Sequence, residues 1–191
     1  MDDDICKGAR EAAWRWMDGA EVVLSEAQVE QAVDKVAREI RRDYQKRHPL
    51  LIAIMGGSVV FAGDLLKRLD FPLEFDTAVV SRYRSDLVGS SVEWRSRPRI
   101  EVAGRDVLLV EDILDAGVTL AAVRAELLGL GAKTVEMAVF CEKDFGERAN
   151  AAKPARARYL GAMVPDRFVF GYGMDAAGAW RNLPRVMAAK S

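Results

Sequence analysis

Two neighbouring acids and a run of small residues stand out within Val107–Leu120, which reads VLLVEDILDAGVTL. The four apolar residues at its start predict a buried strand, and Glu111 and Asp112 follow it directly. Carboxylates at the carboxyl end of a buried strand are costly unless they meet a cation or hydroxyl donors. The adjacent hydroxyl groups of a ribose are such donors. The acid pair therefore predicts a site for a sugar and an associated divalent cation.

The residues after the acids form a turn that opens a helix. Asp115, Ala116, Gly117, Val118 and Thr119 include small residues, so that backbone N–H groups can point at an anion, and the dipole of the helix N-terminus favours negative charge. Thr119 adds a hydroxyl donor. Strand, acid pair, turn and helix together predict a cradle for a phosphorylated ribose. The alternative is a strand end with solvated acids, where Asp115 or Thr119 caps the helix.

Alternating strands and helices must position this cradle. Near-continuous apolar runs are typical of a parallel sheet covered on both faces, so we expect an α/β fold with a parallel-sheet core and helices on both sides. In such sheets, ligands bind beyond the carboxyl ends of the strands. The expected strands are Leu50–Met55, Glu74–Val80, Val107–Val110, Val135–Cys141, Tyr159–Val164 and Phe168–Phe170, and the expected helices follow Ser25 and span Val59–Leu69 and Leu120–Leu130.

Length and composition limit the classes of function. The 191 residues fit one domain, and a net charge of −1 gives no general attraction to nucleic acid or to an anionic membrane. The first residues, MDDDICKGAR, lack the apolar stretch of a signal peptide, and no apolar run approaches the roughly 20 residues that span a bilayer. We therefore expect a cytoplasmic protein without a nucleic-acid or membrane partner.

The segment Val107–Leu120 resembles the motif with which type I phosphoribosyltransferases bind 5-phosphoribosyl-1-pyrophosphate (PRPP). The resemblance implies that Glu111 and Asp112 hold the ribose hydroxyls and a Mg²⁺ ion, and that residues 115–119 bind the 5′-phosphate. It also implies one domain over residues 1–191. Its core would cover about 36–160, and a small hood would come from the two chain ends, about 1–35 and 161–191.

The C-terminal region resembles the signature of hypoxanthine-guanine phosphoribosyltransferases. Residues 164–175 read VPDRFVFGYGMD, residues 180–183 read WRNL, and residues 141–144, CEKD, resemble the lysine-bearing loop of that family. This resemblance implies that Lys143 donates to O6 of a purine, that Phe168 stacks on the purine ring, and that Val169 contacts the base edge through its backbone. Asp175 would contact the purine and hold a second Mg²⁺.

Further roles follow from the same resemblance. Asp115 would lie near N7 of the purine and assist its deprotonation, and Arg181 would bind pyrophosphate. Residues 81–99 would form a lid, with Tyr83 as a catalytic residue in its Ser-Arg-Tyr-Arg stretch. Many members carry Lys or Arg where this chain has Gly56, so the backbone N–H groups of Gly56 and Gly57 are the expected pyrophosphate contacts. Similar glycine-rich and Arg-Tyr-Arg features are known in a bacterial branch.

The implied reaction joins hypoxanthine or guanine to PRPP and yields IMP or GMP and pyrophosphate, with Mg²⁺ as cofactor and an oxocarbenium-like transition state. Two alternatives remain: a regulator of this fold that binds PRPP without turnover, and an enzyme that prefers xanthine. The resemblance also implies a homo-oligomer, either a dimer or a tetramer. Preference among the purines, the hold on pyrophosphate without a basic residue at Gly56, and the role of residues 1–20 stay open.

Overall fold

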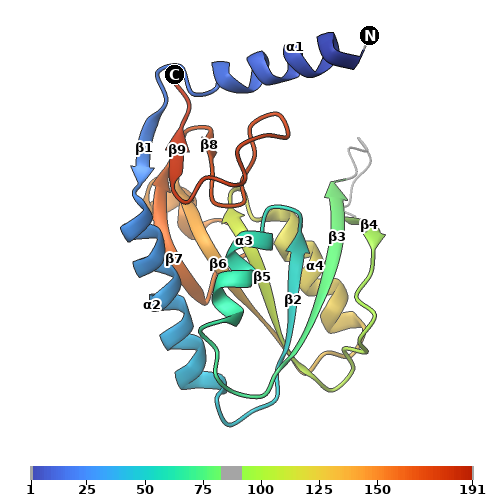
Figure 1. The fold of residues 1–191 in the computed structure, drawn as a ribbon. Coiled ribbons are helices and arrows are strands. Elements are labelled where there is room, and N and C mark those ends of the chain that lie inside the picture. The colour runs from blue at the N-terminus through green and yellow to red at the C-terminus, as the bar shows by residue number, and fades with distance from the viewer. Residues whose placement is uncertain (1, 83–91, 191) are drawn as a thin grey trace.

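The computed structural model describes residues 2–82 and 92–190 of the chain. Figure 1 shows its elements, and helices and strands alternate along most of the chain. They are α1 (Asp2–Arg15), β1 (Glu21–Leu24), α2 (Glu26–Tyr44), β2 (Leu50–Met55), α3 (Val59–Leu66), β3 (Glu74–Arg82), β4 (Val92–Ser96), β5 (Asp106–Leu114), α4 (Val118–Gly129), β6 (Thr134–Asp144), α5 (Glu147–Ala151), β7 (Tyr159–Pro165), β8 (Val169–Phe170) and β9 (Val186–Ala188).

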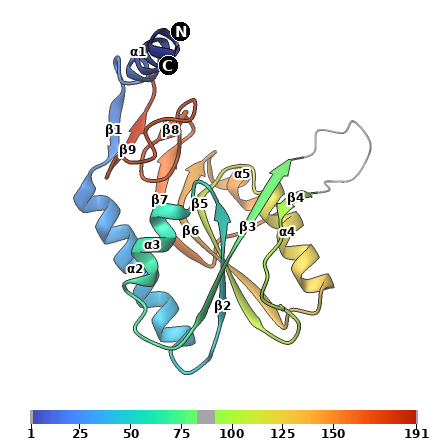
Figure 2. The same ribbon diagram turned by 45° about the vertical axis from the view of Figure 1, so that its right-hand side comes forward.

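A six-stranded sheet in the order β4-β3-β2-β5-β6-β7 forms the centre. Its pairs are parallel except for β3 with β4, which lies at one edge and runs antiparallel. Helices α2 and α3 cover one face and α4 covers the other, as Figures 1 and 2 show. The expected α/β architecture is confirmed.

Burial on both faces explains why the central strands are apolar throughout. In β2, Leu51 and Ala53 belong to the core beneath α2 and α3, whereas Leu50, Ile52 and Ile54 belong to the core beneath α4. Successive side chains of a strand point to opposite faces, so a strand buried on both faces has no solvent-facing positions that favour polar residues. The continuous apolar runs are therefore a consequence of the two helical layers.

Helix α2 begins where its capping signal predicts. The hydroxyl of Ser25 accepts a hydrogen bond from the backbone N–H of Gln28, and the side chain of Gln28 accepts one from the backbone N–H of Ser25. Its buried side includes Val29, Val33 and Ile40, which lie on one face of the helix. The cap thus fixes where α2 begins, and the apolar positions set which face of the helix turns to the sheet.

A second, three-stranded sheet in the order β1-β9-β8 unites the two ends of the chain. It lies beyond the carboxyl ends of the central strands, above β6 and β7 in Figure 1. Helix α1 runs outward from this sheet. It is tied back by Trp14, which meets Trp180 edge-on, and by Trp180, whose indole N–H donates to the Ala13 carbonyl at 2.7 Å. The small sheet therefore forms a cover over the edge where ligands of parallel sheets bind.

Asp43, at the end of α2, ties that helix to β7. Its carboxylate accepts hydrogen bonds from Arg42 at 2.8 Å, from the Tyr159 hydroxyl at 2.9 Å and from Arg158 at 3.3 Å. These bonds, that from Arg42 foremost, hold the pKa of the Asp43 carboxyl well below its usual value. The ionised form of Asp43 is therefore favoured in the folded chain.

Replacing Asp43 with asparagine is expected to lower the free energy of unfolding by about 1 kcal/mol near neutral pH, since both arginines are largely exposed. A depressed folded-state pKa stabilises above the unfolded value, about 4, and this stabilisation is lost as pH falls through the folded-state pKa. Urea unfolding at about pH 7 and about pH 3 should show a smaller difference between wild type and variant at the lower pH. A difference that does not change with pH would refute this role of Asp43.

Candidate active site

The acid pair lies where β5 loses one of its two neighbours. β5 pairs with β2 as far as Val110, but it pairs with β6 as far as Leu114. The expected end of the strand at Val110 is therefore wrong, because pairing with β6 alone carries β5 four residues further. Glu111 and Asp112 sit inside this one-sided stretch, where the missing neighbour leaves room on the β2 side.

The two carboxylates are neighbours, with Glu111 half-buried and Asp112 buried. Burial raises the pKa of Glu111 well above its usual value, and the nearby charge of Asp112 raises it further. Asp112 is only 8% exposed, and one of its oxygens accepts a hydrogen bond from the backbone N–H of Ile113 at 2.9 Å. No ion pair to either acid is found within residues 2–82 and 92–190. The pair has the chemistry of a site that takes a cation.

The loop after β2 passes directly beneath Asp112. A Cβ atom added at Gly57 would lie 1.7 Å from Oδ2 of Asp112, so only glycine fits between the loop and the carboxylate. The same loop meets the C-terminal region on its other side, because a Cβ at Gly173 would lie 2.0 Å from the Gly57 carbonyl oxygen. Gly57 thus brings three distant segments into contact at the acid pair.

The turn after β5 has the form that a phosphate cradle needs. Gly117 stands at the N-cap of α4 with φ of 76°, a left-handed conformation that favours glycine, and no side chain caps the helix there. The N-cap residue of α4 is therefore Gly117, and not Asp115 or Thr119. A pocket of about 330 Å³ opens over this turn, and its lining includes Gly57, Glu111, Asp112, Asp115, Gly117 and Thr119.

A second pocket, of about 260 Å³, adjoins the first. Its lining is formed by Asp112, Ile113, Asp115, Lys143, Phe168, Val169, Met174 and Asp175. The two pockets share Asp112, Ile113 and Asp115, so a molecule in one can touch a molecule in the other. The second pocket combines an aromatic ring, a cation and carboxylates, a mixture that suits a flat polar ring system.

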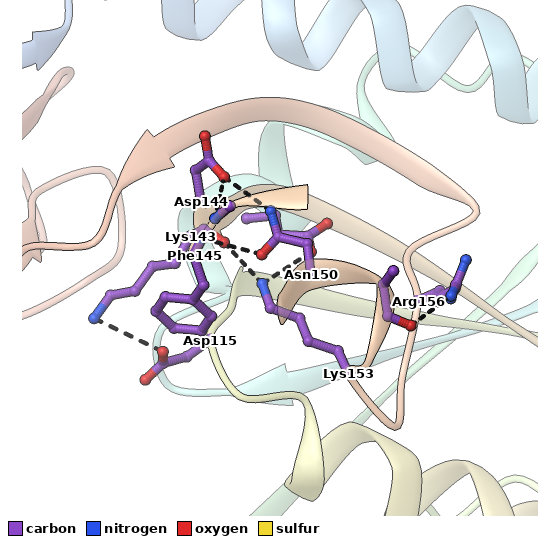
Figure 3. Close-up of polar contacts among 10 residues, drawn as sticks. Asp115, Lys143, Asp144, Phe145, Asn150, Lys153 and Arg156 are labelled. Carbon is purple, nitrogen blue, oxygen red and sulfur yellow. Dashed lines mark hydrogen bonds and ion pairs between the residues drawn. The ribbon is translucent and has the colours of Figure 1, made fainter. Parts of the chain in front are cut away.

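Lys143, near the end of β6, points toward the shared residue Asp115, as Figure 3 shows. Its Nζ atom lies 3.8 Å from Oδ1 of Asp115 and 3.9 Å from Oδ1 of Asp166. Both distances are too long for direct hydrogen bonds. The ammonium group is therefore held in the pocket by charge and can still donate to a ligand.

Comparison with known proteins gives a consistent result. Residues 20–176 match the model of the phosphoribosyl transferase domain. The chain belongs to the phosphoribosyltransferase family. It is 34% identical to the hypoxanthine-guanine phosphoribosyltransferase of Bacillus subtilis, over 91% of this chain and 94% of that relative. It is 37% identical over 88% of its length to the bifunctional protein TilS/HprT of Listeria innocua, of which it spans only 26%.

Solved phosphoribosyltransferase structures share the fold. A hypoxanthine phosphoribosyltransferase from Staphylococcus aureus superimposes with a TM-score of 0.79 at 30% identity, covering 89% of this chain and 91% of that one. A hypoxanthine-guanine-xanthine phosphoribosyltransferase superimposes with a TM-score of 0.78 at 30% identity, covering 90% and 97%. These likenesses extend over most of the chain.

The phosphoribosyltransferase fold brings most of the expected site residues together. Ala116 and Val118 are exposed on the cradle turn, Gly56 is exposed in the loop after β2, and the other expected residues described here line the pockets or lie beside them. Arg181 lies beside the second pocket through its ion pair with Asp175, whose nitrogen–oxygen distance is 2.7 Å. Tyr83 lies outside the described residues.

Two residues that contact expected site residues were missed by sequence reasoning. Trp16 lies against Phe168, with ring centroids 4.9 Å apart, and it does not line the second pocket. Lys153 has a buried ammonium group that reaches the backbone of Lys143. The aromatic residues near the N-terminus could have signalled the first, whereas Lys153 stands in an alanine-rich stretch without any periodic signal.

No helix within residues 2–82 and 92–190 is both long enough and apolar enough to cross a membrane. Those residues also contain no group of three or more His, Cys, Asp or Glu side chains arranged to hold a metal ion. Magnesium in phosphate chemistry uses one or two protein carboxylates, with waters and substrate phosphates as its other ligands. Glu111 and Asp112 meet that requirement.

Proposed function

We propose that this chain transfers the phosphoribosyl group of PRPP to hypoxanthine or guanine, giving IMP or GMP and pyrophosphate. The observation that carries the proposal is the junction of the two pockets at Asp112, Ile113 and Asp115. One pocket has the acids and the helix N-terminus that suit a ribose phosphate, and the other has the ring, cation and carboxylates that suit a purine. A reaction that joins the two ligands needs this contact.

In this proposal the first pocket binds PRPP. Glu111 and Asp112 accept hydrogen bonds from the ribose hydroxyls, and the turn from Asp115 to Thr119 holds the 5′-phosphate at the N-terminus of α4. Glu111 and Asp112 would hold one Mg²⁺ ion and Asp175 a second, and these ions would supply positive charge to the leaving pyrophosphate. Backbone N–H groups of Gly56 and Gly57 face the same anion from the loop after β2. This support replaces a basic side chain in that loop.

The second pocket selects the base. The Lys143 ammonium donates to O6 of a 6-oxopurine, Phe168 stacks on the ring, and the backbone of Val169 meets the base edge. Adenine presents a donor in place of O6 and would oppose Lys143. Asp115, at the junction, accepts the proton that the purine loses as it attacks the anomeric carbon.

Arg181 serves the departing pyrophosphate. Its guanidinium is held by Asp175 and donates to the Gly173 carbonyl at 2.7 Å, which leaves further N–H groups on its exposed side. As pyrophosphate leaves, positive charge builds on the ribose in an oxocarbenium-like state, and negative charge builds on the leaving group. A prepositioned cation such as Arg181 stabilises that negative charge.

Mixing the protein with PRPP, Mg²⁺ and one of four bases tests the proposal. We expect pyrophosphate release with hypoxanthine and guanine, and kcat/KM for adenine lower by at least about a hundredfold, because a site built to donate to an acceptor rejects a base that lacks it. Preferential turnover of adenine would contradict the assignment of Lys143. PRPP binding without release of pyrophosphate with any base would identify a regulator instead.

A further inference from the structure

Lys153 is a charged residue that is buried in the fold and lines neither of the two pockets described above. It follows α5, and its side chain is 3% exposed. Among the residues that the structure describes, only Ser58, Asp112 and Lys153 are polar or charged and buried. A buried ammonium group is unfavourable unless it is paired and hydrogen-bonded, so the contacts of Lys153 must offset the cost of its burial.

Those contacts all lie on the strand end that carries Lys143. The Nζ atom of Lys153 donates to the backbone carbonyl of Lys143 at 2.7 Å and to Oε1 of Glu142 at 2.9 Å. The same ammonium lies 4.6 Å from the ring centroid of Phe145, a cation–π contact. Figure 3 shows Lys153 reaching toward the Lys143 backbone from the turn beyond α5.

The turn after β6 is fixed by further hydrogen bonds. Asp144 accepts from the backbone N–H of Gly146 at 2.8 Å and from the side-chain amide of Asn150 at 2.9 Å. The side-chain Oδ1 of Asn150 accepts from the backbone N–H of Phe145 at 3.1 Å. Within residues 2–82 and 92–190, the side chain of Lys143 makes only the two long ion pairs described above. The direction of its side chain is therefore set by its backbone, which the pairing with Val164 of β7 and the bond from Lys153 hold together.

We propose that Lys153 is a positioning residue, which acts on the base through Lys143. The inference rests on the proposed function, because it concerns how the lysine that recognises O6 is aimed. Lys153 holds the carbonyl of Lys143 and the carboxylate of Glu142 with one charged group. Rotation of the peptide at Lys143 would break the first bond, so the ammonium of Lys143 stays directed at the second pocket.

Steady-state kinetics of Lys153→Met and of a matched control test the proposal. Lys153→Met keeps most of the length of the unbranched side chain and removes its charge and donors. We expect the KM for hypoxanthine to rise about tenfold, the size of a lost hydrogen bond to a charged group, while the KM for PRPP changes less than about twofold. The control Lys133→Met removes an exposed lysine near Asp106 at the opposite end of β6 and should leave both values unchanged.

A double-mutant cycle separates positioning from simple loss of stability. In a Lys143→Met background, Lys153→Met should raise the KM for hypoxanthine less than about twofold further, because the group that it aims is gone. Independent, multiplicative effects, or equal increases in the KM for hypoxanthine and for PRPP, would overturn the proposal. If Lys153→Met does not fold, Lys153→Arg replaces it. Arginine keeps the charge, but its larger guanidinium group cannot reproduce the contact of the ammonium group with the Lys143 carbonyl. We again expect a higher KM for hypoxanthine and a nearly unchanged KM for PRPP.

The wild-type measurement distinguishes this inference from the proposed function. Wild-type protein that releases no pyrophosphate with any 6-oxopurine refutes both, since the inference depends on that activity. Wild-type turnover of hypoxanthine combined with an unchanged KM in Lys153→Met refutes the role of Lys153 alone. Thermal unfolding of each variant shows whether a kinetic change follows from partial unfolding.

Discussion

Replacing Asp115 with asparagine is expected to lower kcat for hypoxanthine by about 10²–10⁴-fold, while the KM for PRPP changes little. The asparagine amide has the same shape and can hydrogen-bond to the purine, but it cannot take a proton from it. Asp115 stands at the junction of the two pockets, which is where the attacking nitrogen must lie. Steady-state rates with saturating PRPP measure the effect directly.

The matched control for this variant is Asp166→Asn. Asp166 is the other acid near Lys143, with an Oδ1–Nζ distance of 3.9 Å against 3.8 Å for Asp115. It lies outside both pocket linings, and an exposed ion pair of this kind contributes little. Its loss should change kcat less than about twofold. Equal losses in the two variants would mean that Asp115 acts only through the charge of Lys143.

Gly57→Ala is expected to lower kcat/KM for PRPP by at least about a hundredfold, because a displacement near 1 Å in a reacting site has that effect. The added methyl group would lie 1.7 Å from Oδ2 of Asp112, so the carboxylate or the loop must move. Asp112 is bound to the Ile113 backbone, and the loop carbonyl lies against Gly173, so both movements break existing contacts. The KM for PRPP should therefore rise.

Gly63→Ala provides the comparison, since Gly63 is exposed in α3 and a Cβ there meets nothing within 4 Å. Alanine is the better helix former, so this variant should be as active as wild type and slightly more stable. Kinetics for PRPP and thermal unfolding of both variants complete the experiment. Full activity in Gly57→Ala would show that the acid pair does not need its present position.

The cradle and the main helices were predictable because their signals are contiguous. In Val107–Leu120 the strand, the acids, the turn and the helix follow one another without a gap, and Ser25 with Gln28 marks the start of α2 locally. The end of β5 was not predictable, because the polar pair at 111–112 looks like a strand end. Only the partner strand β6, remote in sequence, shows that pairing continues to Leu114.

The parts of the site that could not be predicted from the sequence depend on contacts between distant segments. Lys153 is buried because the chain turns back after α5 onto the end of β6, and a single lysine among alanines does not reveal that turn. Trp16 meets Phe168 through the small sheet, whose strands come from opposite ends of the sequence. Gly57 and Gly173 likewise lie close together although they are far apart in the sequence.

The strand order of the small sheet sets an order of assembly during synthesis. β9 lies between β1 and β8, so neither outer strand has its neighbour until residues 186–188 have left the ribosome. The strands and helix of the proposed PRPP cradle are complete much earlier along the chain. Phe168, which precedes β8, becomes fixed only when β9 inserts. A nascent chain therefore completes the proposed cradle before the wall of the proposed purine pocket.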